Sequence, residues 1–289
     1  MEFSELLKKV RELELIANKN VHSSLSGDYI TSIPGKGLQF HEARKYNPGE
    51  SIRLIDWNMT ARLGEPYVKV VLDEREREVI IALDISPSMY SGWQDKTKIE
   101  FALELSATIA VSAIKNRDRV GHILFTNRVV ESLRPSSGRA QLFRCLKAFI
   151  ESSETPTTDA GTDIRSVLHE IQKNRNKKYI LFIISDFIDR DIPDDLKYLR
   201  AGHDINFLHI YDPLEYLSTD ALMMPSFSPE SFTDRGIIRL GETGSLEEMI
   251  EYLKNSADRY RISYESFSTT DHAGKKLRSF FHKKRRRVL

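Results

Sequence analysis

The sequence contains a single cysteine, Cys145, and no hydrophobic run long enough to cross a membrane. One cysteine cannot form an internal disulfide or a thiolate metal cluster, which excludes disulfide-stapled secreted domains. The longest apolar run, residues 179–184, is far shorter than the roughly 18 residues of a transmembrane helix. Acidic residues precede the first leucines, so the basic start of a signal peptide is missing. We therefore expect a cytoplasmic protein.

The sequence also lacks the short motifs of common enzyme classes. There is no P-loop for ATP, no Gly-x-Ser-x-Gly elbow, no His-Glu-x-x-His helix and no Gly-x-Gly-x-x-Gly turn. The eight histidines are scattered without ligand spacing. His122 and His209 fall inside apolar runs, where a hydrogen-bonded core histidine is the more common case. These absences favour a protein that binds over one that catalyses.

Positive and negative charges nearly cancel, with 43 Lys and Arg against 42 Asp and Glu. The last fifteen residues, 275–289, contain eight basic residues and no acid, which leaves the other 274 residues with a net charge of −7. A mildly acidic body is not expected to bind nucleic acid specifically. We interpret the basic end as a solvated tail; the alternative is peripheral contact with anionic lipid or with an acidic patch on a partner.

From residue 78 onward, short apolar runs alternate with amphipathic stretches. Residues 79–83, 179–184 and 205–210 are continuous apolar runs, which is typical of strands buried on both faces of a parallel sheet. Thr97 and Glu100 form a capping box at the start of a helix whose polar positions lie on one narrow stripe. This order of elements predicts an α/β fold with a doubly wound, mostly parallel sheet.

Residues 1–77 have a different pattern. The first twenty residues suggest an amphipathic helix, and residues 29–69 contain frequent turn residues between short strand-like pieces. We therefore expect two parts: residues 1–77, a helix with a small β-rich appendage, and residues 78–289, the main α/β domain with a C-terminal extension and basic tail.

Polar residues follow two of the predicted buried strands and precede one predicted helix. Asp84, Ser86 and Ser88 come directly after one strand, Asp186 follows another, and Thr162 stands before a helix. In an open α/β sheet these positions meet at the carboxyl edge, where ligands bind. Two carboxylates and three hydroxyls form an all-oxygen donor set that suits Mg²⁺, Mn²⁺ or Ca²⁺ rather than zinc.

Each of these residues also has an ordinary structural interpretation. The serines could satisfy backbone groups in a turn, Thr162 could cap its helix, and Asp186 could be a turn residue. Three motifs in the right order at three predicted sheet ends are more specific than any one of them. We therefore favour the metal site.

The pattern Asp-x-Ser-x-Ser, a later threonine and a later aspartate resembles the metal-ion-dependent adhesion site (MIDAS) of von Willebrand factor A domains. The resemblance implies that Ser86, Ser88 and Thr162 offer hydroxyl ligands to Mg²⁺ and that Asp84 and Asp186 act largely through water. It further implies that a Glu or Asp of a partner completes the coordination. One departure is Phe187, which follows Asp186 where many such domains have glycine.

A second resemblance extends over nearly the whole chain. The sequence is similar to a prokaryotic, uncharacterised von Willebrand factor A-like family whose genes usually lie beside those of MoxR-type AAA+ ATPases. This resemblance implies a MoxR-like AAA+ ATPase as a partner. The motifs that carry it, ahead of Asp84, are residues 35–40, 44–49, 52–58, 60–62 and 67–69.

One cluster within these motifs, Arg53, Asp56, Trp57 and Arg62, allows two interpretations. It is either a docking surface for the ATPase or its client, or a charge-paired network around a packed tryptophan that holds the appendage in place. We favour the second interpretation.

The leading hypothesis is a non-enzymatic, Mg²⁺-dependent protein-interaction module that acts as an adaptor or co-chaperone of a MoxR-like AAA+ ATPase. The alternative is a metal-dependent phosphatase or hydrolase that uses the same carboxylates. Phospho-aspartate chemistry needs a second acid two residues after the first, where this chain has Ser86. A secreted adhesion protein is disfavoured by the lone cysteine and the missing signal peptide.

Overall fold

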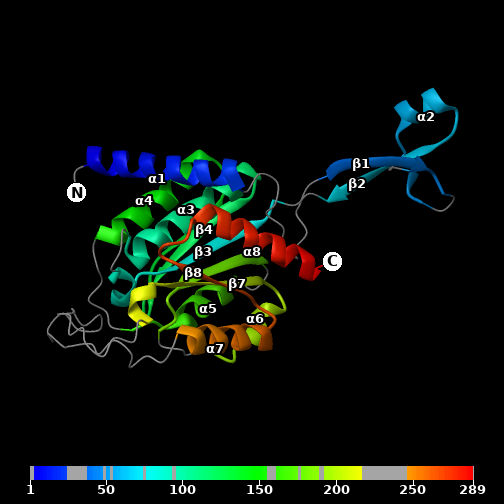
Figure 1. Ribbon diagram of the computed structural model, residues 1–289. Coiled ribbons are helices and arrows are strands. Elements are labelled where there is room, and N and C mark those ends of the chain that lie inside the picture. Colours follow the sequence, from blue (N-terminus) through cyan, green and yellow to red (C-terminus); the bar gives the residue numbers. More distant parts are fainter. Residues whose placement is uncertain are drawn as a thin grey trace, which may run out of the picture. The chain divides into compact units, whose positions relative to one another are not determined.

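The computed structural model describes residues 3–24, 38–47, 50–52, 55–73, 76–92, 96–154, 161–174, 177–188, 192–216 and 246–288 (Figure 1). The chain divides into two compact units. The smaller unit is Ile33–Arg77, and the larger unit combines Met1–Ser32 with Glu78–Leu289. The two units are described separately below.

The larger unit is built on a mixed sheet of six strands in the order β5-β4-β3-β6-β7-β8. All neighbouring strands are parallel except β4 and β5, which form an antiparallel hairpin at one edge. The α/β fold class and the mostly parallel sheet are therefore confirmed. The strands are β3 (Glu78–Asp84), β4 (Arg119–Phe125), β5 (Val129–Ser136), β6 (Tyr179–Ser185), β7 (Asp204–Tyr211) and β8 (Ser263–Ser268).

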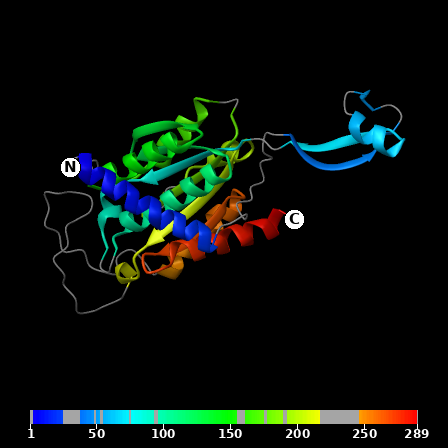
Figure 2. The same ribbon diagram turned by 90° about the horizontal axis from the view of Figure 1, so that it is seen from above.

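Helices cover both faces of this sheet, as a doubly wound fold requires (Figures 1 and 2). One face carries α1 (Phe3–Ser24), α3 (Lys98–Lys115), α4 (Arg139–Glu154) and α8 (Ala273–Val288). The other face carries α5 (Ile164–Gln172), α6 (Leu196–Arg200) and α7 (Leu246–Arg259), whose apolar side chains share a core with the strands. None of the described helices combines the length and the apolar character needed to cross a bilayer.

Helix α3 is buried on nearly all sides because α1 covers its outer surface. Thr97 and Glu100 form the predicted capping box at its start. The ends of the narrow polar stripe of α3, Glu100 and Lys115, are exposed, but its middle is covered by α1. Asn20 of α1 donates to Glu104 Oε1 at 3.0 Å and to Thr108 Oγ1 at 3.3 Å. The middle of the stripe is thus a polar seam between two helices.

The sequence-based division grouped the N-terminal helix with the appendage, but in the structure α1 belongs to the larger unit. Its buried side chains, Leu6, Val10, Ala17 and Val21, lie on the stripe that contacts α3, α4 and α8. At Gly274 of α8 an added Cβ would come within 2.9 Å of the Asn20 side chain, so α8 also approaches α1 closely. An amphipathic helix needs an apolar partner, and α3 provides it.

The smaller unit contains a two-stranded antiparallel sheet of β1 (Leu38–Lys45) and β2 (Tyr67–Asp73), with α2 (Trp57–Leu63) between them in sequence. Asp56 caps the start of α2 by accepting from two backbone amides. Gly64 ends the helix with a φ of 76°, a left-handed conformation that glycine adopts without strain. The small antiparallel sheet is the β-rich appendage that the turn residues predicted.

The basic C-terminal stretch forms the helix α8, and the expectation of a solvated tail is wrong for Lys284. Lys284 Nζ is buried and lies 2.7 and 2.8 Å from the two carboxylate oxygens of Asp204. It also donates to Asn206 Oδ1 at 2.6 Å. Lys283 pairs with Glu265 of β8 at 2.9 Å. These basic side chains therefore fasten α8 to the sheet.

Two histidines and one cysteine are buried in the core, and the two histidines were expected to be structural. His122 and His209 are buried and hydrogen-bonded, to Glu131 at 3.2 Å and to the Tyr264 hydroxyl at 2.9 Å, which confirms the expectation. Burial lowers the pKa of both histidines, that of His209 to about 3. Cys145 is a buried thiol whose pKa is raised by burial to about 12.

Replacing Lys284 with methionine is expected to lower the free energy of unfolding by ~3–5 kcal/mol, because Asp204 would be left buried without its counter-charge. Urea unfolding measures the difference. Lys275→Met, which removes an exposed lysine from the same helix, is the control. Lys284→Met/Asp204→Asn should recover much of the loss. Equal stability of Lys284→Met and Lys275→Met would contradict the anchoring role.

Acid is expected to destabilise the fold through His209. Its folded pKa of about 3 lies below its usual value of 6.5, so the unfolded chain binds the proton first and stability falls as the pH drops through this window. Between pH 7.5 and pH 5 the loss should be about 2 kcal/mol. His209→Gln should remove it, and exposed His169→Gln should not. A pH series of urea unfolding curves tests this, and identical pH dependence in all three proteins would refute it.

Candidate functional site

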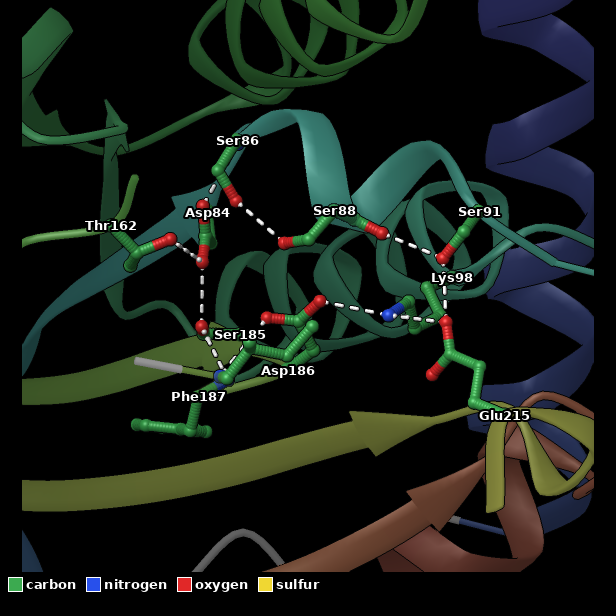
Figure 3. A network of polar contacts seen from close by, with 11 residues as sticks. Asp84, Ser86, Ser88, Ser91, Lys98, Thr162, Ser185, Asp186, Phe187 and Glu215 are labelled. Atoms are coloured by element: carbon green, nitrogen blue, oxygen red, sulfur yellow. Dashed lines mark hydrogen bonds and ion pairs between the residues drawn. The ribbon is translucent and has the colours of Figure 1, made fainter. Parts of the chain in front are cut away.

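The candidate site lies where β3 and β6 end side by side. These strands are parallel and pair Leu83 with Ile184, so Asp84 and the Ser185–Asp186 pair reach the same edge of the sheet. Asp84 and Asp186 are both buried. Thr162 precedes α5 and faces the same edge, as Figure 3 shows. The structure thus brings together polar groups from segments far apart in the sequence.

Asp84 is held by donors from three segments. Its Oδ1 accepts from the backbone amide of Ser86 at 2.9 Å. Its Oδ2 accepts from Ser185 Oγ at 2.6 Å and from Thr162 Oγ1 at 3.2 Å. Burial and the neighbouring charge of Asp186 nevertheless raise the pKa of Asp84 to about 7. Two close, buried carboxylates create a strong local demand for positive charge.

The two serines of the first motif stand at the start of the short helical turn η2 (Pro87–Tyr90). Their hydroxyls lie 3.1 Å apart, and both face the Asp84 side of the site in Figure 3. Together with Thr162 they supply three neutral oxygens beside the two carboxylates. This donor set fits a hard cation such as Mg²⁺ or Mn²⁺. The described chain contains no group of three or more His, Cys, Asp and Glu residues placed to hold a metal ion, and the candidate site, with two carboxylates and three hydroxyls, is not such a group.

The sequence analysis missed Lys98, a charged residue at the centre of this region. Its Nζ lies 2.8 Å from Asp186 Oδ2 and 2.7 Å from Glu215 Oε1, and its side chain is 0% exposed. Burial alone would lower the pKa of Lys98, but Asp186 and Glu215 raise it above its usual value. The available signal was a lysine at the first position of a helix that is otherwise mostly apolar.

A second polar contact joins this lysine to the first motif. Glu215 lies on the helical turn η3 (Pro213–Tyr216), which follows β7. Ser91 Oγ donates to Glu215 Oε1 at 2.6 Å and to the backbone oxygen of Ser88 at 2.8 Å. The network in Figure 3 therefore runs from Thr162 and Asp84 on one side to Glu215 on the other.

Within the smaller unit itself, the predicted cluster of the appendage is not a network around a packed tryptophan. Trp57 is 66% exposed, and none of the described α2 side chains is buried. Asp56 serves as the helix cap, accepting from the amides of residues 58 and 59 at 3.0 and 3.2 Å. Arg62 is exposed in the last turn of α2. Arg53 lies outside the described residues. Trp57 is therefore not packed within the smaller unit, and both interpretations of the cluster, attachment to the main domain and docking of a partner, stay predictions.

Comparison with known proteins shows which family the chain is similar to. The family described as "Protein of unknown function DUF58" matches residues 42–219. The uncharacterized protein Rv1480 of Mycobacterium tuberculosis is 26% identical over 210 residues, which is 72% of this chain and 66% of the relative. The match thus covers just under two thirds of that relative's length.

Two solved structures are similar in fold. The conserved hypothetical protein BatB from Bacteroides thetaiotaomicron is 19% identical, with a TM-score of 0.48 over 73% of this chain and 99% of that one. The SpRpn10 VWA domain is 11% identical, with a TM-score of 0.40 over 70% of this chain and 93% of that one.

Ser185 was not among the predicted site residues, yet its hydroxyl donates to Asp84 and accepts from the Phe187 amide at 2.9 Å. Ser185→Ala should therefore lower the free energy of unfolding by ~1–3 kcal/mol, because it leaves buried groups without partners. Ser185→Thr keeps the hydroxyl and should retain most of the stability. Ser153→Ala, on the part-exposed end of α4, is the control for urea unfolding. If Ser185→Ala matches that control, the hydroxyl has no such role.

Proposed function

The chain belongs to the DUF58 family of proteins of unknown function, and from this premise we propose that it is a metal-dependent protein-interaction module. The observation that carries the proposal is the convergence of Ser86, Ser88 and Thr162 with two buried carboxylates at one edge of the sheet. All donors are oxygens, and in the described part of the chain the Ser86 and Ser88 hydroxyls pair with each other. Such a site is suited to binding.

Each residue has a distinct part in the proposed site. The hydroxyls of Ser86, Ser88 and Thr162 hold Mg²⁺, or Mn²⁺, through neutral oxygens, while Asp84 and Asp186 balance its charge largely through water. When bound, the cation supplies an open coordination position that a Glu or Asp of a partner protein can fill. The backbone amide of Ser86 and the Ser185 hydroxyl keep Asp84 in place.

We further propose that the partner is a MoxR-like AAA+ ATPase or its client, with this chain acting as a cytoplasmic adaptor or co-chaperone. Support for this step comes from the family resemblance of residues 35–69. The smaller unit adds a physical argument, because Ile52, Trp57 and Leu63 expose large apolar side chains there. An exposed tryptophan is a frequent anchor of protein interfaces.

The alternative, a metal-dependent phosphatase or hydrolase, has weaker support. The position two residues after Asp84 is Ser86, so the second acid of phospho-aspartate chemistry is absent. Lys98 is held as an ammonium by two carboxylates and cannot serve as a neutral base. Generic phosphoester substrates with Mg²⁺ test this directly: turnover that is lost in Asp84→Ala would favour the enzyme.

Capture of the cognate MoxR-like ATPase by the immobilised protein tests the proposed function. Wild type should capture it in Mg²⁺ and lose most of the signal in EDTA, and Asp84→Ala should lose at least about tenfold, because the site can no longer balance a divalent charge. Asp195→Ala removes an exposed aspartate outside the site and should behave as wild type. Thermal unfolding checks that each variant is folded. Equal capture with and without Mg²⁺ would defeat the proposal.

A further inference from the structure

The charges around the candidate site do not balance within the described chain. Asp84, Asp186 and Glu215 contribute three carboxylates, and Lys98 contributes one ammonium that contacts two of them. With all groups ionised, the cluster carries a net charge of −2. One divalent cation would neutralise it. Lys98 is therefore not a substitute for the cation, and its buried position needs a different explanation.

Lys98 divides the two oxygens of Asp186 between two environments. Oδ2 accepts from Lys98 Nζ at 2.8 Å, a charge-assisted hydrogen bond. Among the described residues, Oδ1 accepts a long contact of 3.4 Å from the Ile188 amide. In Figure 3 the Asp186 carboxylate lies between Lys98 on one side and Asp84 on the other. One oxygen is thus engaged by the lysine, and the other is left for the hydroxyl-lined side.

The lysine is itself fixed from a second direction. Glu215 Oε1 accepts from Lys98 Nζ at 2.7 Å and from Ser91 Oγ at 2.6 Å, so the ammonium cannot follow Asp186 without breaking these contacts. Ser91 in turn bonds the backbone of Ser88, within the first motif. Lys98, Glu215 and Ser91 thus form a continuous set of polar contacts from Asp186, at the end of β6, to Ser88, which follows β3. We call this set the brace.

Resting on the proposed function, we propose that Lys98 is the positioning residue that holds Asp186 back from the cation. A carboxylate that closed on the cation would add a full negative charge to it and occupy a coordination position. The brace keeps Asp186 at a distance bridged by water, so the site remains able to accept a carboxylate from a partner protein. Lys98 thereby sets both the affinity of the site for the cation and the availability of a coordination position for a partner's carboxylate.

The second buried lysine of the larger unit shows what a purely structural role looks like. Lys284 pairs with Asp204 at the start of β7, whereas the candidate site lies at the carboxyl ends of β3 and β6. Its other partner is the neutral amide of Asn206. Its removal should affect stability and leave cation binding unchanged. Lys284 therefore provides a control matched in residue type and burial.

The test compares two variants that each remove one buried lysine and one of its acids without changing the net charge. Lys98→Met/Glu215→Gln frees Asp186, and Lys284→Met/Asp204→Asn is the matched control. Because the charge sum of the site is the same before and after, a change in cation affinity reports the release of Asp186. Glu215→Gln alone, which retains Lys98 on Asp186, separates the two substitutions. Thermal unfolding in EDTA identifies the folded fraction.

Calorimetry with Mg²⁺ and europium luminescence are the two readouts. Eu³⁺ is a hard, oxygen-seeking ion, and its lifetimes in H₂O and D₂O count the water molecules bound to it. Lys98→Met/Glu215→Gln should bind Mg²⁺ about tenfold more tightly than wild type, within the range by which neighbours of metal ligands alter affinity. Its Eu³⁺ should carry about one fewer water, replaced by an Asp186 oxygen. The control and Glu215→Gln should keep the wild-type water count.

The outcomes separate this inference from the function on which it rests. Tighter binding with fewer waters in the Lys98 variant alone supports the positioning role. If wild type binds the ions and the Lys98 variant has the same affinity and water count, Lys98 is only structural, and the metal-dependent function stands. If wild type takes up neither ion, the proposed function is overturned, and the positioning role with it. A reduced water count in the Lys284 control would also overturn the positioning role.

Discussion

Two carboxylates buried side by side at the end of a parallel sheet are the constraint on which this structure depends. Asp84 and Asp186 repel each other and are both buried, and burial together with the charge of Asp186 raises the pKa of Asp84 to about 7. Hydrogen bonds from Ser86, Ser185 and Thr162 offset part of this cost. Lys98 offsets a further part. Such an expensive arrangement is hard to explain by stability alone.

The scaffold around this edge is held by polar contacts between layers as well as by its apolar core. Asn20 joins α1 to α3, and Lys284 joins α8 to β7. These contacts place the two terminal helices of the described chain against the same face of the sheet. A site at the strand ends then rests on elements whose positions are fixed from several directions. Rigidity of this kind is what an interaction site needs to present a preformed surface.

The chemistry of the site and the exposed surface of the smaller unit both favour recognition of a protein partner. Under the proposed function, the hydroxyl ligands and the lysine-engaged carboxylate would leave a coordination position of the cation open for an acid of a partner. The smaller unit exposes Trp57 and Leu63 on α2. An acidic contact and an apolar contact are complementary means of recognising a protein partner.

Local patterns were sufficient for the architecture and for much of the candidate site. Apolar runs identify β3, β6 and β7, because strands buried on both faces need apolar side chains at every position. The rule that parallel strands end at one edge then places Asp84 beside Asp186. The same patterns could not assign α1 to a unit. An amphipathic stripe shows that one face of a helix is covered, but it does not identify the element that covers it.

By itself, the sequence determined which segments become strands and which oxygen-bearing residues end beside one another, since both follow from periodicity along the chain. Only the tertiary structure decided which charged side chains are buried and which partners they pair with. Lys98 meets Asp186 across 88 residues, and Lys284 meets Asp204 across 80. A lysine in an amphipathic helix is normally solvated, and it becomes buried only when folding brings an acid to it. Pairing of this kind is a property of three-dimensional proximity, which no local pattern contains.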